Sequence, residues 1–287
     1  MTLDVDSDIL IQALQKRGVE SKKVSWDDPS VDWAEPDLCI SKSTSNYIFG
    51  KDKPFREWMK RVEDTTPLWN TRRVMEWNLD KHYLKDLEEK GVPIPPTIVV
   101  ERWSTKSLEE VLRDVEWQDL IIKPVISAGS FGLQRLKRGE DAEKHLRAVT
   151  NEGFTIEFQG VTYTSGPQAA IIQPFLQEIF GGEVSLIYFG RELCNSVLKI
   201  AKAGDIRSHP GYGAKVISHT PSPEELRVGD LVIDSVEEPH FARIDLVRTS
   251  MGPRVIEVEL IEPFLFFDMF PETAEPFANH IIDFLKG

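Results

Sequence analysis

The stretch LIIKPVISAGSFGLQRL at residues 120–136 places Lys123 inside an apolar run and continues into a Ser-Ala-Gly-Ser-Phe-Gly loop at residues 127–132. A buried ammonium group is costly unless an anion pairs with it. The pattern therefore indicates either a strand that ends in an ordinary turn or a clamp for the phosphates of a nucleotide. In a clamp, the glycines would allow backbone N–H groups to approach phosphate oxygens. No Gly-Lys-Ser/Thr sequence follows, so the loop is not a Walker motif.

The composition is that of an ordinary globular protein, with 41% apolar and 28% charged residues over 287 positions. This length suits two or three subdomains. The net charge of −13 argues against nucleic acid as a partner, because neutralising phosphates requires a basic face. A bound polyphosphate would need local lysines or metal ions to offset the overall negative field.

The chain carries no recognisable targeting or membrane signal. Its first residues, MTLDVDSD, are acidic and unlike a signal or transit peptide. No apolar run approaches the roughly 20 residues of a membrane span. Cys39 and Cys194 match no disulfide or metal spacing, as is typical of core thiols in a reducing compartment. We therefore expect a cytoplasmic protein with no membrane partner.

Hydrophobic periodicity and turn residues predict a mixed chain, α+β or α/β in class. Ser7 or Asp8 is the expected cap of the first helix, and strands dominate after Gly182. Helices are expected at residues 7–18, 53–65, 80–91, 107–117, 140–150 and 274–287. The proline-rich link from Pro93 to Pro96, and Pro174, mark two boundaries. These divide the chain into an N-terminal α/β domain at 1–94, a small α+β unit at 95–172 and an antiparallel-sheet domain at 173–287.

Two strands near the C-terminus carry an unusual set of charges. FARIDLV at 241–247 and RVIEVELIE at 254–262 flank a Gly-Pro turn, which predicts an antiparallel hairpin. Side chains alternate between the faces of a strand, so apolar residues including Ile256 should lie on one face. The other face would then gather Arg243, Asp245, Glu257 and Glu259.

Carboxylates packed that closely repel one another, and their pKa values rise unless a cation neutralises them. Hard oxygen ligands of this kind suit Mg²⁺, which prefers a few carboxylates together with substrate phosphates. The sequence therefore predicts a metal site, and the alternative is a solvated outer face of the sheet.

Several of these motifs occur in a familiar order. Lys81 in NLDKHYL, then IIKP with its small-residue loop, IIQPFLQEI, ARID and IEVE together resemble the ATP-grasp superfamily in its glutathione-synthetase-like branch. VSWDDPSVDW, WNLDKHYL, GVPIPPT, KPVISAGSFG and VELIEPFLF resemble the small ligases that include the D-cycloserine-forming enzymes. The resemblance spans nearly the whole chain. It implies an ATP-grasp fold in which a pre-ATP-grasp domain precedes a lid and a catalytic subdomain.

The resemblance implies an ATP site between two α+β units. Lys81 and Lys123 would each contact phosphate, and the small-residue loop would close over the β- and γ-phosphates. The following strand would read adenine, and a carboxylate would bind the ribose hydroxyls. The residues implied for the loop, adenine and ribose contacts are Ser127, Gly129, Ser130, Gln173, Phe175, Leu176 and Glu183. The alternatives are an ordinary turn and an inter-domain strand with incidental polar residues.

The same resemblance implies catalytic roles near the C-terminus. Arg243 would meet the transferred phosphate. Asp245, Glu257 and Glu259 would hold Mg²⁺, expected as two ions that Mn²⁺ can replace. The insert SVLKIAKAGDIRSHPGYGAKV at 196–216 would direct Lys199 and Arg207 to the substrate carboxylate and acyl phosphate, unless it is a solvated hairpin tip. His209 is weak evidence for an acid or base, and Glu262 is expected to be structural.

Two departures from the family pattern affect what can be transferred. Related ligases begin with an apolar strand, whereas this chain begins with MTLDVDSD, so its N-terminal sheet is expected to lack that strand. An Arg-Ser-Thr-Trp-Asp-Tyr stretch is replaced by KSTSNY at 42–47, which leaves the acceptor substrate open. Glu-x-Glu replaces the usual Glu-x-Asn at 257–259 and adds a charge to the site.

The resulting hypothesis is a Mg-dependent carboxylate–amine ligase that uses ATP to form an amide bond through an acyl phosphate. Its partners would be a small, amino-acid-like carboxylate and an amine. A one-substrate cyclase, a kinase-like enzyme and an ATP-binding protein without turnover stay open as alternatives. Homodimers are frequent in the family, and the sequence does not locate an interface.

Overall fold

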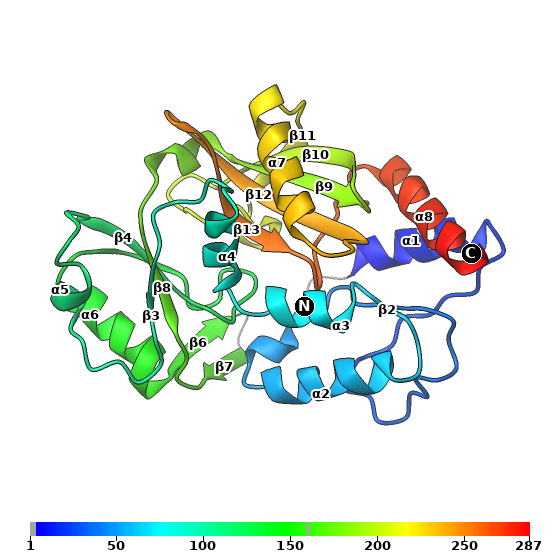
Figure 1. The fold of residues 1–287 in the computed structure, drawn as a ribbon, viewed down its shortest axis with the longest axis horizontal. Coiled ribbons are helices and arrows are strands. Elements are labelled where there is room, and N and C mark those ends of the chain that lie inside the picture. Colours follow the sequence, from blue (N-terminus) through cyan, green and yellow to red (C-terminus); the bar gives the residue numbers. More distant parts are fainter. Residues whose placement is uncertain (1–3, 159–160) are drawn as a thin grey trace.

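The computed structural model describes residues 4–158 and 161–287, whose elements form three groups along the chain. The first group lies beneath and beside a central sheet, and the second extends to the opposite side (Figure 1). The mixed α/β class expected from the sequence is confirmed. No helix among the described residues is long and apolar enough to cross a membrane.

The N-terminal group combines helices with a short parallel sheet. Its elements are α1 (Val5–Gln15), β1 (Cys39–Ile40), α2 (Asp52–Glu63), β2 (Leu68–Trp69), α3 (Arg72–Asn78) and α4 (Tyr83–Glu89). The cap predicted at Ser7 or Asp8 was wrong. The carboxylate of Asp4 accepts a hydrogen bond from the backbone N of Ser7, so the helix begins one residue after Asp4.

The middle group is built on an antiparallel sheet with strand order β3-β8-β4-β5 and a separate β6–β7 hairpin. Its elements are β3 (Ile98–Val100), α5 (Leu108–Val111), β4 (Asp119–Pro124), β5 (Gln134–Lys137), α6 (Glu140–Arg147), β6 (Phe154–Phe158), β7 (Val161–Ser165) and β8 (Ala170–Pro174). Since β8 continues through Gln173 to Pro174, the boundary expected after residue 172 falls inside a strand. The division into three domains stays a prediction.

The C-terminal group is an antiparallel sheet with strand order β11-β10-β9-β12-β13. Its elements are β9 (Glu183–Phe189), β10 (Glu192–Ile200), β11 (Lys215–Ser218), α7 (Pro223–Ser235), β12 (Phe241–Thr249), β13 (Gly252–Glu259) and α8 (Ala274–Lys286). Short 3₁₀ turns occupy Asn46–Ile48, Gln177–Gly181, Pro210–Tyr212 and Pro271–Thr273, and Ala148–Glu152 forms a π-type turn.

The strand β12 is buried on both faces, which explains why its sequence is so apolar. Ile244 and Leu246 pack in one cluster with Val228 and Val232 of α7. Phe241 packs on the other face in a cluster with residues of α8. Arg243 and Asp245 lie on the same face of β12 as Phe241, opposite the face that packs on α7.

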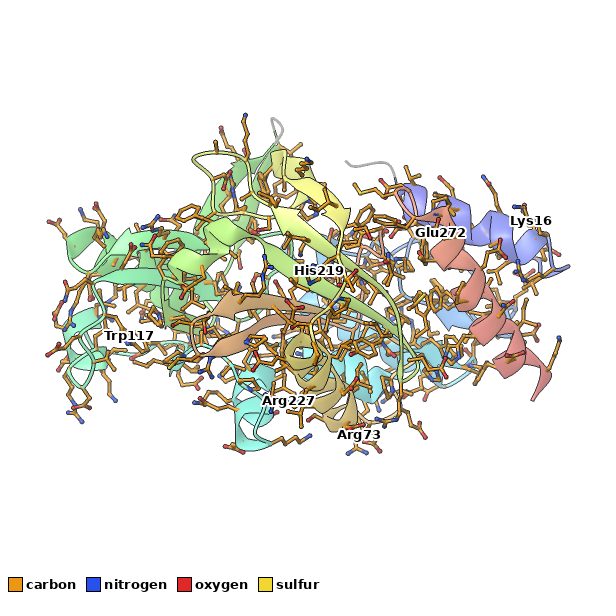
Figure 2. All side chains as sticks on the ribbon, turned by 90° about the horizontal axis from the view of Figure 1, so that it is seen from above. Lys16, Arg73, Trp117, His219, Arg227 and Glu272 are labelled. Atoms are coloured by element: carbon orange, nitrogen blue, oxygen red, sulfur yellow. The ribbon has the colours of Figure 1, made fainter. Side chains whose placement is uncertain are left out.

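The helices α1 and α8 pack together at the end of the molecule opposite α5 and α6. Figure 2 shows Lys16 and Glu272 labelled at the α1–α8 end and Trp117 at the other. Arg17 donates to Asn279 at 3.0 Å and also pairs with Glu275. The first and last helices of the chain therefore form one unit.

Candidate active site

The hairpin of β12 and β13 brings the predicted carboxylates together. Its register pairs Arg243 with Glu259 and Asp245 with Glu257. One oxygen from each of the three carboxylates lies within 4.8 Å of the others. The polar faces of the two strands therefore coincide, as the alternation predicted.

One side chain of the hairpin departs from the simple alternation. Asp245 pairs with Glu257, whereas the next residue, Leu246, pairs with Val255, so Ile256 is an extra residue in a β-bulge. Ile256 is half-buried and stands outside the apolar cluster that holds Val255. The prediction that it faces the core was wrong, because a one-residue insertion shifts the alternation locally.

Buried cations surround the carboxylates. Arg243 contacts Asp245 at 3.0 Å and also donates to Glu259. Lys199 lies 3.2 Å from Asp245 and forms an ion pair with Glu183. Burial alone would raise the pKa of Asp245, but Arg243 and Lys199 hold it well below its usual range.

Glu259 is the least compensated acid of the three. Burial, opposed by Arg243 and reinforced by repulsion from Glu257 and Asp245, raises the pKa of Glu259 to about 7. A divalent cation would relieve this repulsion, because it would bring the positive charge that the third carboxylate lacks. The oxygen donors present therefore fit a hard cation such as Mg²⁺.

Both predicted phosphate lysines reach the same cluster. Lys81 lies 3.1 Å from Glu257 and donates to the carbonyl of Ser127 at 2.5 Å. Lys123 is 6% exposed and donates to the carbonyl of Ile256 at 3.3 Å. Burial lowers the pKa of Lys123 to about 8, although Glu257 opposes the shift. The lysine inside the apolar run thus lies beside the strand that carries two of the carboxylates.

The small-residue loop has the backbone of a tight, unusual turn. Gly129, Ser130 and Gly132 all have positive φ, of 56°, 64° and 73°. A Cβ on Gly132 would come within 2.6 Å of Pro124 and 2.7 Å of Phe154, so glycine is required there. The Ser127 hydroxyl donates to the carbonyl of Pro124 at 3.2 Å. A non-glycine residue such as Ser130 adopts this conformation at some cost, as residues of ligand-binding loops often do.

The residues predicted to read the nucleoside lie along β8 and β9. The Gln173 amide donates to Thr97 at 2.9 Å, and the backbone N of Phe175 is already bonded to Asp119 at 2.8 Å. The carbonyl of Phe175 accepts no hydrogen bond within the described residues, and Leu176 lies immediately before a 3₁₀ turn. Glu183 is directed toward Lys199 on the neighbouring strand.

Among the predicted catalytic residues, Arg207 makes no hydrogen bond or ion pair with the cluster carboxylates in the described structure. Its guanidinium lies 2.7 Å from Asp205 and 3.7 Å from the ring centre of Tyr212. Tyr212 in turn donates to the carbonyl of Gly129 at 3.2 Å, which joins the insert to the small-residue loop. Burial, together with the positive charges of Arg243 and Lys199, lowers the pKa of His209 in the same insert to about 4.

Glu262 was expected to be structural, yet it lies beside the triad. Its carboxylate accepts a hydrogen bond from the Tyr47 hydroxyl at 2.6 Å. Burial and repulsion from Glu259 raise the pKa of Glu262 to about 8. A cavity of about 20 Å³ is lined by both residues together with Lys81, Glu257 and Glu259. No local pattern marks Glu262, because it follows the end of the strand.

The sequence also did not predict that Asp6 and Lys42 hold the segment that contacts Arg243. Asp6, which is fully buried, accepts hydrogen bonds from the backbone N of Leu265 and of Phe267, at 2.5 and 2.8 Å. Lys42 lies 3.6 Å from Asp6 and donates to the carbonyl of Pro263 at 2.7 Å. These contacts fix residues 263–267, within which the carbonyl of Phe264 accepts from Arg243 at 3.2 Å.

Comparisons with known proteins agree with this geometry. Residues 1–70 match the family model described as the N-terminal domain of D-cycloserine synthetase DcsG. The cycloserine biosynthesis protein DcsG of Streptomyces lavendulae is 25% identical over 303 aligned positions, which cover 100% of this chain and 96% of that protein. A probable alpha-L-glutamate ligase of Coxiella burnetii is 26% identical over 205 positions, covering 71% of this chain and 61% of that protein.

Two solved structures have the same fold. The crystal structure of D-cycloserine synthetase DcsG superposes with a TM-score of 0.84 at 24% identity, covering 99% of this chain and 96% of that one. The D-alanine–D-alanine ligase of Bacillus anthracis complexed with ATP gives 0.69 at 14% identity, covering 98% and 91%. The fold is therefore the ATP-grasp fold. By fold and by its relatives the chain is an ATP-grasp ligase, a class that uses ATP and Mg²⁺. Among its relatives, it is similar to D-cycloserine synthetase along its full length.

Proposed function

We propose that the chain joins a small, amino-acid-like carboxylate to an amine, using ATP to form an amide bond through an acyl phosphate. One observation carries this proposal. Asp245, Glu257 and Glu259 converge with Lys81 and Lys123 on one side of a hairpin. Such a set can bind a metal ion and neutralise a polyphosphate at the same place.

ATP would lie between the middle and C-terminal groups of elements. Lys81 and Lys123 would pair with phosphate oxygens, and the loop at 127–132 would donate backbone N–H groups to them, with the hydroxyls of Ser127 and Ser130 as further donors. The Gln173 side chain with the backbone at Phe175 and Leu176 would meet adenine. Glu183 would exchange its contact with Lys199 for the ribose hydroxyls.

The three carboxylates would hold Mg²⁺, which we infer to be two ions that Mn²⁺ can replace. When bound, the metal supplies charge neutralisation for the β- and γ-phosphates. Arg243, held by Asp245 and Glu259, would face the transferred phosphoryl group.

The reaction would proceed in two substitutions. A carboxylate oxygen of the substrate attacks the γ-phosphorus, the bond to the β-phosphate oxygen breaks, and ADP leaves. The amine nitrogen then attacks the acyl carbon, the C–O bond to phosphate breaks, and the nitrogen loses a proton as inorganic phosphate leaves. Positioning and electrostatic stabilisation provide most of the catalysis in reactions of this kind.

The basic insert at residues 196–216 would supply the cations that contact the substrate. Lys199 is buried next to Asp245, and it would contact the acyl phosphate. Arg207 would do so after leaving Asp205, so its contribution depends on movement of the insert. Tyr212 on the carbonyl of Gly129 couples that insert to the loop that would exclude water from the intermediate.

A second candidate is an intramolecular cyclase that closes a ring on one substrate. The full-length similarity to D-cycloserine synthetase favours it. A ligase needs two substrates for product formation, whereas a cyclase forms product from one. A kinase-like enzyme would instead give a stable phosphorylated product, and a binding protein would release no ADP.

The proposal is tested by measuring ADP release over a panel of D- and L-amino acids and related carboxylic acids, in the presence of hydroxylamine. We expect one acid to give both ADP and a hydroxamate, because hydroxylamine traps an acyl phosphate. ADP with a stable phosphorylated product would contradict the ligase. ADP and a cyclic product from a single acid, with no hydroxamate, would favour the cyclase.

A further inference from the structure

The middle sheet carries Gln173 and Lys123 on the same face. Its strand β8 lies between β3 and β4 (Figure 1). Ile171 of β8 pairs with Lys123 of β4. Two residues further along β8, Gln173 pairs with Ile121, and directly paired residues of antiparallel strands share a face. Ile171 packs in a cluster with residues of β12 and β13. Gln173 and Lys123 therefore lie on the face of the sheet that is turned toward the C-terminal group.

Gln173 is a buried amide that uses one of its two ends. It is only 4% exposed, and its amide lies 2.9 Å from the hydroxyl oxygen of Thr97. Thr97 directly precedes β3, in which Ile98 pairs with Ile172, so Thr97 is the cross-strand neighbour of Gln173. No described residue donates a hydrogen bond to the other end of the amide. Since buried polar atoms are normally paired, this end is open to a ligand.

The hydroxyl of Thr97 determines which end of the amide is open. Its oxygen lies 2.7 Å from the carbonyl oxygen of Pro95. A carbonyl oxygen can only accept and a hydroxyl has a single hydrogen, so Thr97 donates that hydrogen to Pro95. The hydroxyl oxygen must then accept from Gln173, and only the NH₂ group of an amide can donate. The side-chain oxygen of Gln173 is therefore the open end.

The carbonyl that receives the Thr97 hydrogen belongs to a stiff segment. Pro95 is buried and is followed by Pro96 in the run VPIPPT at residues 92–97. Two consecutive proline rings fix φ at both positions and keep the first of them extended. The carbonyl of Pro93 also accepts from the backbone N of Val255 at 2.8 Å, which ties the segment to β13. The fold therefore sets the direction of the Thr97 O–H bond.

An acceptor at this position distinguishes between purines. Adenine carries an amino group at C6, which donates hydrogen bonds, whereas hypoxanthine and guanine carry an oxygen there, which accepts them. The Gln173 oxygen would receive a hydrogen bond from the amino group but would face a C6 oxygen acceptor to acceptor. Leaving buried acceptors unpaired lowers affinity, because their contacts with water have already been lost. A glutamine that was free to turn could instead present its NH₂ group and accept either base.

We propose that Thr97 is a positioning residue for nucleotide choice. By donating to Pro95 it fixes the Gln173 amide with the oxygen toward the base. The site then selects a purine triphosphate with a C6 amino group over one with a C6 oxygen. Thr97 acts through Gln173. This inference rests on the proposed ATP site, because it requires the base to lie at Gln173.

The test measures the Kd of MgATP and of MgITP by calorimetric titration, since the two bases differ only at C6 and N1. We expect the unmodified chain to bind MgATP at least roughly tenfold more tightly than MgITP. In Thr97→Val the hydroxyl is lost and the Gln173 amide can turn, so the two Kd values should come within about threefold of each other. Thr97→Ser keeps the hydroxyl and should keep the preference for MgATP.

A further variant separates the orientation of the amide from a loss of structure. Gln173→Glu in the Thr97→Val background offers only acceptor oxygens to the base, so the preference for MgATP should return. Thr155→Val is the matched control, because it removes an exposed hydroxyl that contacts Thr164 at 3.2 Å. It should leave both Kd values unchanged.

Equal Kd values for MgATP and MgITP in the unmodified chain would overturn this inference and leave the proposed ATP site in place. So would a Thr97→Val variant that keeps the preference, even with weaker binding of both nucleotides, since Thr97 would then have only a structural role. A double variant that binds both nucleotides equally would also contradict the role of amide orientation. Absence of MgATP binding in the unmodified chain would overturn the proposed function together with this inference.

Discussion

The carboxylate cluster on β12 and β13 and the cavity beside β1 differ in whether their buried polar groups have partners. In the cluster, Asp245 has Arg243, Lys199 and the Ser185 hydroxyl as partners. In the cavity, buried atoms such as the Ser41 hydroxyl have no partner in the described structure. The cluster is organised before any ligand binds, which favours catalysis by preorganised charge. The cavity, which has a volume of about 430 Å³ and is lined by residues 19–24 and 38–42, leaves the Ser41 hydroxyl and the Trp58 indole unpaired within the described residues.

The largest expected effect tests the cluster directly. Glu257→Gln removes the charge that pairs with Lys81 and contributes to the metal site. We expect ADP release with the active carboxylate to fall by roughly 10³-fold or more. The matched control is Glu116→Gln on an exposed loop, which should leave the rate unchanged. Near-normal turnover in Glu257→Gln would show that Glu257 takes no part in the active site.

The next effect concerns the lysine within the apolar run. Lys123→Met should weaken MgATP binding by roughly 100-fold, because a buried cation near the phosphates is lost. The fold should persist, since methionine fills similar space without an ammonium group to desolvate. Calorimetric titration with MgATP measures the change, and Lys106→Met at an exposed position is the control. Unchanged affinity in a folded variant would contradict the clamp.

A substitution at Asp6 tests how much its buried hydrogen bonds to residues 263–267 stabilise the fold. Asp6→Asn removes an acceptor from two backbone N–H groups and the charge facing Lys42. We expect a loss of about 3 kcal/mol in the free energy of unfolding, as for other broken buried charge contacts. Asp8→Asn two residues later breaks only an exposed pair with Lys23 and should cost less than about 1 kcal/mol. If urea titrations gave the same loss of unfolding free energy for both variants, the contacts of Asp6 would be no more stabilising than the exposed pair.

The smallest effect is a pH dependence. The folded pKa of Lys123, about 8, lies below its ordinary value near 10.5 because of burial. Below pH 8 the side chain is charged and can pair with phosphate, whereas above pH 8 it loses its proton in the free protein. The Kd for MgATP should therefore rise by up to about tenfold per pH unit above 8. In Lys123→Met this rise should be absent, and its persistence there would assign the dependence to another group.

The sequence predicted best where the signal was local. Alternation along two strands was enough to gather Asp245, Glu257 and Glu259, and the motif order was enough to predict the ATP-grasp fold. The bulge at Ile256 was not predictable, because it depends on register with β12. Helix α7 was not predicted, although Ser222 and Glu225 form a capping box at its start.

Long-range contacts account for the remaining omissions. Asp6 reaches residues 265 and 267 across more than 250 positions, and Tyr47 reaches Glu262 across 215. No spacing rule links such positions. Arg207 was predicted near the cluster from its motif, but the adjacent Asp205 holds it elsewhere. Local charge pairing can thus override the placement that a motif implies.

The most direct test of the central claim is calorimetric titration of the unmodified chain with ATP, first with Mg²⁺ and then with a chelator. If the hairpin carboxylates and the two lysines form a metal–nucleotide site, ATP should bind with Mg²⁺ and bind at least tenfold more weakly without it. Glu257→Gln should abolish that difference. Equal affinity with and without Mg²⁺, or no ATP binding in either condition, would contradict the account.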